Sequence, residues 1–361
     1  MIGAGLPGGA DRNGPADGST NGAPNGSTGE RFLVTGALGC IGAWTVRTLV
    51  AGGTSVVAFD MAGDPKRLRL IMSERELAKV TFVRGDITDR DAIGRALDEH
   101  GITHLIHLAA LQVPFARADP PLGALVNVVG TVNVLEAAKR HAGLRGPVVY
   151  TSSIGMFEAA DADAADGRLH VDATAHPRTH YGVYKLANEG NARVYWLDDG
   201  LSSVGLRPLT VYGPGRDQGL TSGPTKAILA AVVGRPYRIA FGGRTLLQYA
   251  EDVARALIAA GRSGLTGARV FNLGGSLVGI DDLVATIERC VPEATGLVTH
   301  DPEPLPFPDA IDDAGIEAIG EVPVTPLDEA VRRTVEVFRR SLDRGSLVPE
   351  EHGLEPVATT S

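Results

Sequence analysis

A glycine-rich turn between a short apolar strand and a helix constrains the fold of this chain more than any other feature. The strand is predicted at residues 31–35 and the helix at 40–51, and between them lie Gly36, Gly39 and Gly42 at a G-x-x-G-x-x-G spacing. The first glycine allows a tight turn, the second lets the backbone approach a pyrophosphate at the helix N-terminus, and the third lets the helix pack close to the sheet. The alternative is an ordinary strand–turn–helix corner, and the context favours the phosphate-binding turn.

The segments after this turn alternate between strand and helix patterns. Strands are predicted at 54–59, 80–84, 104–108, 147–151 and 203–207, with helices between them that include 90–100, 122–141 and 181–199. Such alternation predicts an α/β chain of the Rossmann type, a doubly wound parallel sheet with helices on both faces.

Four segments are predicted along the chain. Residues 1–29 are rich in Gly, Pro, Asn and Ser and are expected to be a disordered tail, because they bury too little apolar surface to offset their ordering entropy. Residues 30–207 form the nucleotide-binding domain, which also carries the predicted catalytic residues. Residues 208–345 form a smaller mixed α/β region for substrate, and residues 346–361 a loose tail. In the smaller region, helices are predicted near 224–233, 251–260, 280–289 and 326–340, and a strand near 269–273.

Composition narrows the classes of partner. The net charge is −9, so no basic excess is available to neutralise the phosphates of a nucleic acid. We count no apolar run close to the roughly 20 residues that span a bilayer, and we expect no membrane partner. The two cysteines, Cys40 and Cys290, form neither a metal-type pair nor a disulfide framework, so no metal is expected and a reducing cytoplasm fits.

An acidic residue ends the second predicted strand. Asp60 is expected to accept hydrogen bonds from the ribose hydroxyls of a dinucleotide and to repel a 2′-phosphate, which favours NAD over NADP. A strand-terminal turn aspartate is the alternative interpretation, and the neighbouring Lys66 and Arg67 leave NADP open. Asp86, after the third strand, could meet the adenine amino group.

Tyr181 and Lys185 lie four residues apart on a predicted helix and therefore share a face. A free tyrosine has a pKa near 10, and a fixed cation beside a phenol favours the phenolate. The pair predicts a proton carrier for a substrate hydroxyl or carbonyl. Tyr184 has no lysine at the matching distance. Ser153, at the carboxyl end of the fifth strand, is expected to polarise the reacting oxygen.

Two other polar residues in this part of the chain are predicted to be structural. For Ser152 we expect a local turn cap. For His107, in the fourth strand, we expect a buried histidine with satisfied hydrogen bonds rather than a ligand or a base.

These motifs stand in one order along the chain: TGALGCIG, Asp60, GDITD, HLAA, NVVGTVNVLEAA, TSS, YGVYK and LRPLTVYGPG. Over about residues 31–260 the combination resembles the extended short-chain dehydrogenases, the group of NAD-dependent sugar-nucleotide epimerases and dehydratases. The resemblance implies NAD as cofactor and places catalytic roles on Ser153, Tyr181 and Lys185. It implies cofactor contacts at Gly36, Gly39, Cys40, Ile41, Gly42, Asp60, Asp86, Ile87, Leu108, Ala109, Ala110, Asn127, Tyr181, Lys185 and Pro208.

The chain departs from that family at two positions. Thr210 stands where sugar-nucleotide members usually carry an Asn that helps to hold the diphosphate sugar, and Thr245 stands where they usually carry an Arg that grips the diphosphate. Arg244, one residue away, could replace this grip, and Arg216 and Arg235 are other cations nearby. The residues expected to contact substrate are Gln112, Ser153, Thr210 and Arg216.

Two functions fit these residues, and two others are disfavoured. The first is an NAD-dependent dehydrogenase or reductase acting on a secondary alcohol or ketone, with Tyr181 moving the proton. The alternative is an epimerase of a sugar or sugar nucleotide that works through a transient ketone and retains NAD. A dehydratase is disfavoured because Ile154 and Gly155 stand where an acidic pair would follow the hydroxyl residue. A non-catalytic NAD-binding regulator is disfavoured because both Tyr181 and Lys185 are present.

The resemblance also implies a homodimer. In that family the helix beginning near Leu122 and the helix of Tyr181 often pair with a second subunit. Here both helices carry apolar residues on more than one face, and on the second helix these are Val183, Leu186, Val194 and Trp196.

Overall fold

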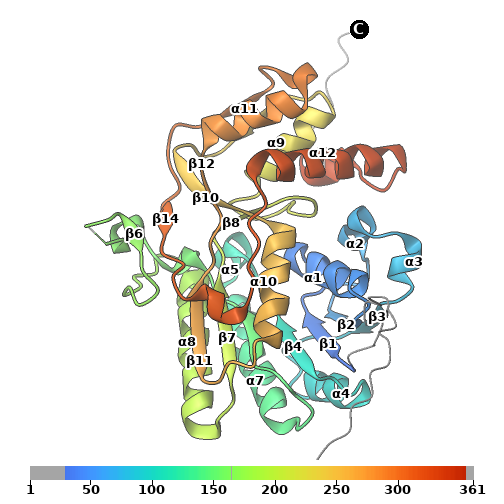
Figure 1. Ribbon diagram of the computed structural model, residues 1–361, viewed down its shortest axis with the longest axis vertical. Helices are drawn as coiled ribbons and strands as arrows, with labels where there is room; N and C mark the ends of the chain where they lie inside the picture. The colour runs from blue at the N-terminus through green and yellow to red at the C-terminus, as the bar shows by residue number, and fades with distance from the viewer. Residues whose placement is uncertain (1–28, 164, 355–361) are drawn as a thin grey trace, which may run out of the picture.

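A seven-stranded parallel sheet forms the centre of the molecule (Figure 1). The computed structural model describes residues 29–163 and 165–354, so the disorder predicted for residues 1–28 lies outside the described residues. From edge to edge the strands are β3 (Thr81–Arg84), β2 (Ser55–Asp60), β1 (Arg31–Thr35), β4 (His104–His107), β5 (Val148–Thr151), β7 (Ser203–Arg207) and β11 (Ala268–Asn272). The predicted doubly wound parallel sheet is confirmed.

Helices cover both faces because the strands alternate apolar side chains toward each face. On β1, Phe32 and Val34 belong to the core that contains residues of α1 and α10, whereas Leu33 belongs to the core that contains residues of α4 and α7. The helices of this part are α1 (Cys40–Ala51), α2 (Lys66–Ile71), α3 (Glu74–Leu77), α4 (Ala92–Glu99), α5 (Val113–Ala118), α6 (Pro120–Ala124), the π-helical η1 (Leu125–Val129), α7 (Gly130–Arg140), α8 (His180–Asp199) and α10 (Ala250–Arg262).

The strand order reverses between β1 and β4. From β1 the chain moves outward to β2 and β3, and then it returns to the other side of β1 with β4. Thr35 at the end of β1 lies beside His107 at the end of β4. Open α/β sheets bind ligands in the crevice at such a reversal, at the carboxyl ends of the strands.

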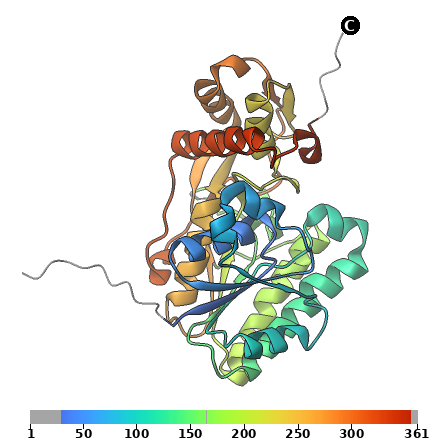
Figure 2. The same cartoon turned by 90° about the vertical axis from the view of Figure 1, so that its right-hand side faces the viewer.

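A smaller region lies at one end of the molecule, above the large sheet (Figure 2). A three-stranded sheet of β8 (Thr210–Tyr212), β10 (Arg244–Tyr249) and β12 (Ser276–Gly279) connects it to the rest. Its helices are α9 (Gly223–Val232), α11 (Ile280–Cys290) and α12 (Leu327–Asp343). Two-stranded pairs and short 3-10 helices complete the chain: β9 (Tyr237–Ile239) with β13 (Val298–His300), β6 (Arg168–Leu169) with β14 (Ala310–Ile311), η2 (Ile154–Met156), η3 (Ala159–Asp161), η4 (Pro292–Ala294), η5 (Ile316–Ile319) and η6 (Pro349–His352).

The predicted domain boundary at residue 207 is wrong, because the chain re-enters the large sheet after it. Helix α10 packs against α1, and β11 pairs in parallel with β7 over five residue pairs. The pairing gives the edge of β7 a partner. The segment 250–272 therefore belongs with residues 30–207 and not with the smaller region.

The predicted loose tail from residue 346 packs as far as Leu354. Leu347 and Leu354 are buried, and η6 lies between them. Arg235 of the smaller region donates to the backbone oxygen of Leu354 at 2.8 Å and pairs with Glu350 at 2.7 Å. Apolar burial and these polar contacts hold the segment, and only residues 355–361 of the predicted tail lie outside the described residues.

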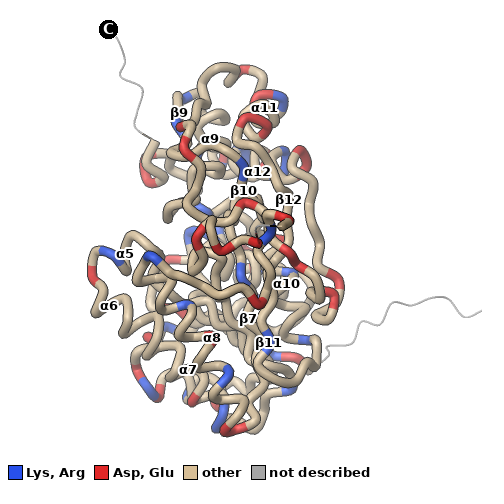
Figure 3. Tube along the Cα trace, turned by 90° about the vertical axis from the view of Figure 1, so that its left-hand side faces the viewer, with Lys and Arg blue, Asp and Glu red and all other residues tan. Residues whose placement is uncertain are grey.

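One helical stretch is long and apolar enough to cross a membrane by length and composition. It runs from Pro120 to Arg140, whereas the sequence analysis found no apolar run of that length. Half of its most apolar window is buried inside the protein. It contains α6, η1 and α7, and these pack against α4 and α8. A core helix passes the same test, so the stretch is weak evidence for a membrane span. Charged residues of both signs are interspersed along the trace (Figure 3).

Candidate active site

The glycine-rich turn lies at the carboxyl end of β1 and depends on close backbone contacts. Gly36 has φ +66°, and a Cβ there would lie 2.6 Å from the backbone nitrogen of Ala109. A Cβ on Gly42 would lie 2.2 Å from the carbonyl oxygen of Gly36, so this glycine is required by the turn itself rather than by helix–sheet packing. No side chain caps the N-terminus of α1. Its free amides fit a pyrophosphate.

Asp60 shapes this turn directly. Its Oδ2 accepts a hydrogen bond from the backbone nitrogen of Leu38 at 2.9 Å, and its Oδ1 accepts one from Ala62 at 2.9 Å. The two cations that left NADP open are engaged elsewhere: Lys66 pairs with Glu351 at 3.3 Å and Arg67 with Asp217 at 2.7 Å. This charge arrangement favours a cofactor with a free ribose 2′-hydroxyl.

We expect the protein to bind NAD at least about tenfold more tightly than NADP, because the Asp60 carboxylate opposes a 2′-phosphate. Asp60→Asn should narrow this preference, since the amide oxygen can still accept one backbone hydrogen bond but the charge is gone. Calorimetric titration with both cofactors measures the ratio, and a thermal melt controls for folding. Equal affinity of the unmodified protein for the two cofactors would contradict the assignment.

The loop after β4 carries the predicted contacts Leu108, Ala109 and Ala110. Its start is held by the Thr35 hydroxyl, which accepts from the backbone nitrogen of Leu108 at 3.2 Å. Its next residue, Leu111, is held by Asn127, whose Oδ1 accepts from the backbone nitrogen at 2.7 Å and whose Nδ2 donates to the backbone oxygen at 2.9 Å. The amide of Asn127 is thus engaged by the loop. The structure therefore gives this side chain a positioning role for the loop, and its predicted contact with the cofactor stays a prediction.

Asp86 and Ile87 follow β3 at the same edge of the sheet. Asp86 Oδ1 accepts from the backbone nitrogen of Thr88 at 2.8 Å, and Ile87 is buried beside Gly130. A Cβ on Gly130 would lie 2.6 Å from the Ile87 side chain, so the glycine lets the long helical stretch pass close to this loop. The predicted adenine contact of Asp86 stays a prediction.

Tyr181 and Lys185 lie in the first two turns of α8, which begins after the N-cap Thr179. The Lys185 side chain is buried, with its residue only 4% exposed. Its Nζ donates to the backbone oxygen of Thr151 at 2.6 Å and lies 5.5 Å from the centre of the Tyr181 ring. The predicted spacing therefore brings an ammonium group to the phenol ring, held by a carbonyl rather than by a carboxylate.

Ser153 ends the loop after β5 and caps η2. Its Oγ accepts from the backbone nitrogen of Gly155 at 2.9 Å. A Cβ on Gly155 would lie 3.0 Å from Ser153 Oγ and 3.9 Å from Cε1 of Tyr181, so the bare glycine leaves space that these two side chains flank. Cε1 of Phe307 would also lie 3.9 Å from that Cβ. The sequence did not single out Phe307, which comes from a proline-rich segment far along the chain.

Tyr184 and Ser152 have structural contacts. Tyr184 is 7% exposed, and its hydroxyl donates to the backbone oxygen of Pro120 at 2.8 Å. We predicted a turn cap for Ser152, and that prediction is wrong. Its hydroxyl instead donates to Glu189 at 2.5 Å. Glu189 also pairs with the buried Arg207 at 2.7 Å, so Ser152 belongs to a buried ionic network under the site. Pro208 accepts from the backbone nitrogen of Ile154 at 3.0 Å.

His107 is a buried histidine with both ring nitrogens engaged, as predicted. Nδ1 lies 2.7 Å from the Thr35 hydroxyl and Nε2 lies 3.0 Å from the Thr131 hydroxyl. Burial lowers the pKa of His107 to about 3, and the nearby charge of Lys185 acts in the same direction.

Acid should destabilise the fold through His107. In the unfolded chain the imidazole titrates near pH 6.5, so its contribution is fully present above that pH. It is lost as the pH falls toward about 3, by up to about 1.4 kcal/mol per pH unit. Urea unfolding between pH 7.5 and 4.5 measures this slope, and His107→Gln should flatten it. An unchanged slope in His107→Gln would contradict the prediction.

The structure places the predicted substrate residues in different surroundings. Gln112 Oε1 accepts from Nη1 of Arg216 at 3.3 Å, so these two residues meet across the crevice. Thr210 is fully buried, and its hydroxyl lies 2.8 Å from that of Thr245, which is 1% exposed. The two positions where the chain departs from the family thus hydrogen-bond to each other. The Thr210 hydroxyl is thus engaged away from solvent, and its predicted contact with substrate stays a prediction.

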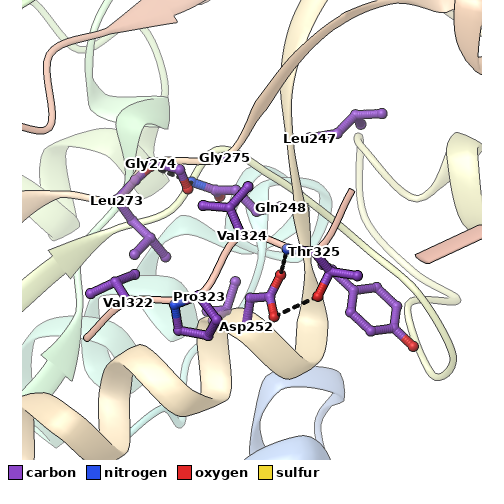
Figure 4. A pocket seen from close by; sticks show the side chains of 12 residues that line it. Leu247, Gln248, Asp252, Leu273, Gly274, Gly275, Val322, Pro323, Val324 and Thr325 are labelled. Carbon is purple, nitrogen blue, oxygen red and sulfur yellow. Dashed lines mark hydrogen bonds between the residues drawn. The ribbon is translucent and has the colours of Figure 1, made fainter. Parts of the chain in front are cut away.

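A small cavity lies near the start of α10, and none of the predicted site residues lines it (Figure 4). Asp252 accepts from the backbone nitrogen of Thr325 at 2.6 Å and from its hydroxyl at 2.9 Å, and burial raises the pKa of this carboxyl. These bonds hold the segment before α12. The lining residues are Leu247, Gln248, Tyr249, Asp252, Val253, Leu273, Gly274, Gly275, Val322, Pro323, Val324 and Thr325. Within the described chain, His, Cys, Asp and Glu side chains form no metal-type group of three or more.

Comparison with known proteins decides the family. The model of the NAD dependent epimerase/dehydratase family matches residues 32–274, which include the glycine-rich turn and the residues around Tyr181. The chain belongs to this family. It is an NAD-dependent enzyme of the extended short-chain dehydrogenase type.

Several members of the family are similar over most of the chain. UDP-glucose 4-epimerase of Mycolicibacterium smegmatis is 33% identical over 86% of this chain and 98% of its own length. The solved structure of Thermus thermophilus UDP-glucose 4-epimerase with NAD is 27% identical and superposes with a TM-score of 0.71, covering 86% of this chain and 99% of that one. MoeE5 in complex with UDP-glucose and NAD is 29% identical with a TM-score of 0.70 and the same coverage.

Proposed function

We propose that this enzyme is an NAD-dependent epimerase that inverts a secondary alcohol carbon of a sugar or sugar nucleotide through a transient ketone. The observation that carries the proposal is its 33% identity to a UDP-glucose 4-epimerase over nearly the whole of that protein. The arrangement of Tyr181, Lys185 and Ser153 supplies what such a reaction needs. We therefore rank epimerisation above the net dehydrogenation that the sequence favoured.

The chemistry would use three side chains in distinct roles. Bound NAD supplies the hydride acceptor and donor. Tyr181 takes the proton from the substrate hydroxyl and later returns it to the ketone oxygen, with the Lys185 charge close to its ring. Ser153 donates a hydrogen bond to the same oxygen while its hydroxyl oxygen still accepts the local bond from the backbone nitrogen of Gly155. Lys185 would also hold the nicotinamide ribose when NAD is bound.

A dehydrogenase acting on a smaller secondary alcohol is the second candidate. The buried contact between Thr210 and Thr245 favours it, because neither hydroxyl is free to hold a nucleotide diphosphate. Both candidates use the same three side chains, so the two reactions differ in what is released and not in how the proton moves.

The test is to follow product stereochemistry and NADH together. The enzyme is incubated with UDP-glucose, UDP-glucuronic acid and a panel of sugars and secondary alcohols, with product read by NMR and NADH by absorbance. We expect an isomerised product without net NADH, from protein that retains NAD through purification. Release of a ketone with one equivalent of NADH would replace the epimerase with the dehydrogenase. Tyr181→Phe protein is the matched blank.

We also propose that the enzyme is a homodimer. Leu125 and Val129 on η1 and Val183 and Val194 on α8 are each between 44% and 52% exposed, and the two segments pack side by side. Such an exposed apolar face fits a second subunit. Light scattering at micromolar concentration should give twice the mass of one chain. In Val194→Glu the measured mass should fall toward that of a single chain. A monomeric mass for the unmodified protein would refute the proposal.

A further inference from the structure

Most basic side chains near the site are neutralised by carboxylates. Such a cation has little charge left for a ligand, because its partner already compensates it. The pairs are Arg67 with Asp217 at 2.7 Å, Lys66 with Glu351 at 3.3 Å, Arg207 with Glu189 at 2.7 Å, Arg235 with Glu350 at 2.7 Å and Arg244 with Asp309 at 2.9 Å. Two of the three arginines that could replace the missing diphosphate grip, Arg235 and Arg244, are therefore already paired.

Arg216 is the third, and its guanidinium meets only neutral groups. Nη1 donates to Gln112 Oε1 at 3.3 Å and Nη2 to the Thr221 hydroxyl at 3.1 Å. Its Nε is buried without a hydrogen-bond partner, and no carboxylate of residues 29–163 or 165–354 forms a salt bridge with it. A guanidinium offers five N–H donors, and an unsatisfied buried donor is costly. This arrangement is typical of a group whose hydrogen bonds a ligand completes.

The loop that carries Arg216 crosses the cofactor turn. Pro214, two residues earlier, accepts from Nε1 of Trp44 on α1 at 2.9 Å. On the other side, Gly219 packs so closely on Gln112 that a Cβ would lie 2.1 Å from its Oε1. Arg216 is also the strongest of the charges that act on the thiol of Cys40, the first residue of α1. The guanidinium is thus close to the uncapped N-terminus of α1.

We propose that Arg216 is an anion-binding residue of this crevice, with a phosphoryl or carboxylate oxygen as its ligand. The planar guanidinium suits bidentate contact with either group. Two sources supply this chemistry: the pyrophosphate of the cofactor, and an anionic group of the substrate. The buried hydroxyls of Thr210 and Thr245 provide no such charge. The proposal deepens the proposed function by naming an anionic substrate as one source, and it rests on that function only for this part.

Equilibrium binding to the full chain tests the assignment. NAD is titrated into the cofactor-free protein, and UDP and glucuronate are titrated into the NAD-loaded protein. We expect Arg216→Gln to weaken NAD or one of the two anions by about 10- to 100-fold. Loss confined to NAD identifies the cofactor pyrophosphate, and loss confined to UDP or glucuronate identifies the substrate. Arg244→Gln, which removes an arginine paired with Asp309, is the matched control and should change neither.

Arg216→Lys keeps the positive charge but loses the planar set of N–H donors that a guanidinium offers. It should therefore lose less affinity than Arg216→Gln. If Arg216→Gln unfolds in a thermal melt, weakened binding by Arg216→Lys with a native melt supports the proposal in its place. Binding of NAD, UDP and glucuronate within about twofold of the unmodified protein, or an equal loss in Arg244→Gln, would overturn it. Because these are binding measurements, their result does not depend on whether turnover proves to be epimerisation or oxidation.

Discussion

Tyr181→Phe should lower turnover by about 10²- to 10⁴-fold and leave NAD binding almost unchanged. The variant keeps the ring that packs beside the Lys185 ammonium but lacks the hydroxyl that carries the proton. Steady-state kinetics on the substrate identified by the NMR test gives the first quantity, and calorimetric titration with NAD gives the second.

Tyr184→Phe is the matched control, because it removes the same atom three residues away. That hydroxyl donates to the backbone oxygen of Pro120 and is buried away from the space that Ser153 and Tyr181 flank. We expect a modest loss of stability, about 1 kcal/mol, and near-normal turnover. If Tyr184→Phe lost activity and Tyr181→Phe kept it, the register of the whole catalytic assignment would be wrong.

The activities of Lys185→Ala and Ser153→Ala rank the contributions of the other two proposed catalytic side chains. Lys185→Ala should lose both turnover and NAD affinity, because the ammonium serves the phenol and the cofactor side. Ser153→Ala should be milder, since it removes one hydrogen bond to the reacting oxygen and no proton carrier. The expected order of activity is Ser153→Ala above Lys185→Ala and Tyr181→Phe.

Gly42→Ala should reduce both folding stability and NAD affinity. The added methyl group would lie 2.2 Å from the carbonyl oxygen of Gly36 and 2.8 Å from Cα of Ala37, and both are backbone atoms that cannot rotate away. Overpacking of this kind costs about 1–3 kcal/mol, and relief of it by movement of the turn would weaken NAD by about 10- to 100-fold. Urea unfolding and NAD calorimetry measure the two effects.

Gly39→Ala separates the fold from the cofactor. A Cβ at Gly39 meets only the Gly36 oxygen, at 3.2 Å, which a small shift can relieve. We expect stability close to that of the unmodified protein and a clear loss of NAD affinity, because this glycine faces the predicted pyrophosphate. Normal NAD binding by Gly39→Ala would show that the cofactor does not approach the turn there.

The nucleotide-binding half of the fold could be predicted because its signals are local. The strand at 31–35, the turn and helix α1 follow each other directly in the chain, and the observed bounds of α1 are those predicted. The four-residue spacing of Tyr181 and Lys185 likewise needs only a helix to place both on one face. Backbone geometry over a few residues decides such features, so a single sequence contains them.

The features that the sequence did not predict depend on contacts between distant residues. The strand at 268–272 could be predicted, but only the free edge of β7 decides that it joins the large sheet. The engagement of Asn127 with Leu111 and of Ser152 with Glu189 spans loops and helices whose relative placement no local pattern contains. Phe307 reaches the space beside Tyr181 for the same reason.

The sequence by itself determined the fold class and the use of NAD, and it placed the proposed proton-carrying pair on one helix face, because strand–turn–helix order and helical spacing are properties of short segments. Tertiary structure alone decided which polar groups are free to meet a ligand. Thr210 and Thr245 lie 35 residues apart and hydrogen-bond to each other inside the protein. Arg216 has no carboxylate partner among the described residues, whereas the neighbouring arginines and lysine do. Burial and pairing of polar groups are set by which distant segments pack together, and that packing separates a contact residue from a structural one.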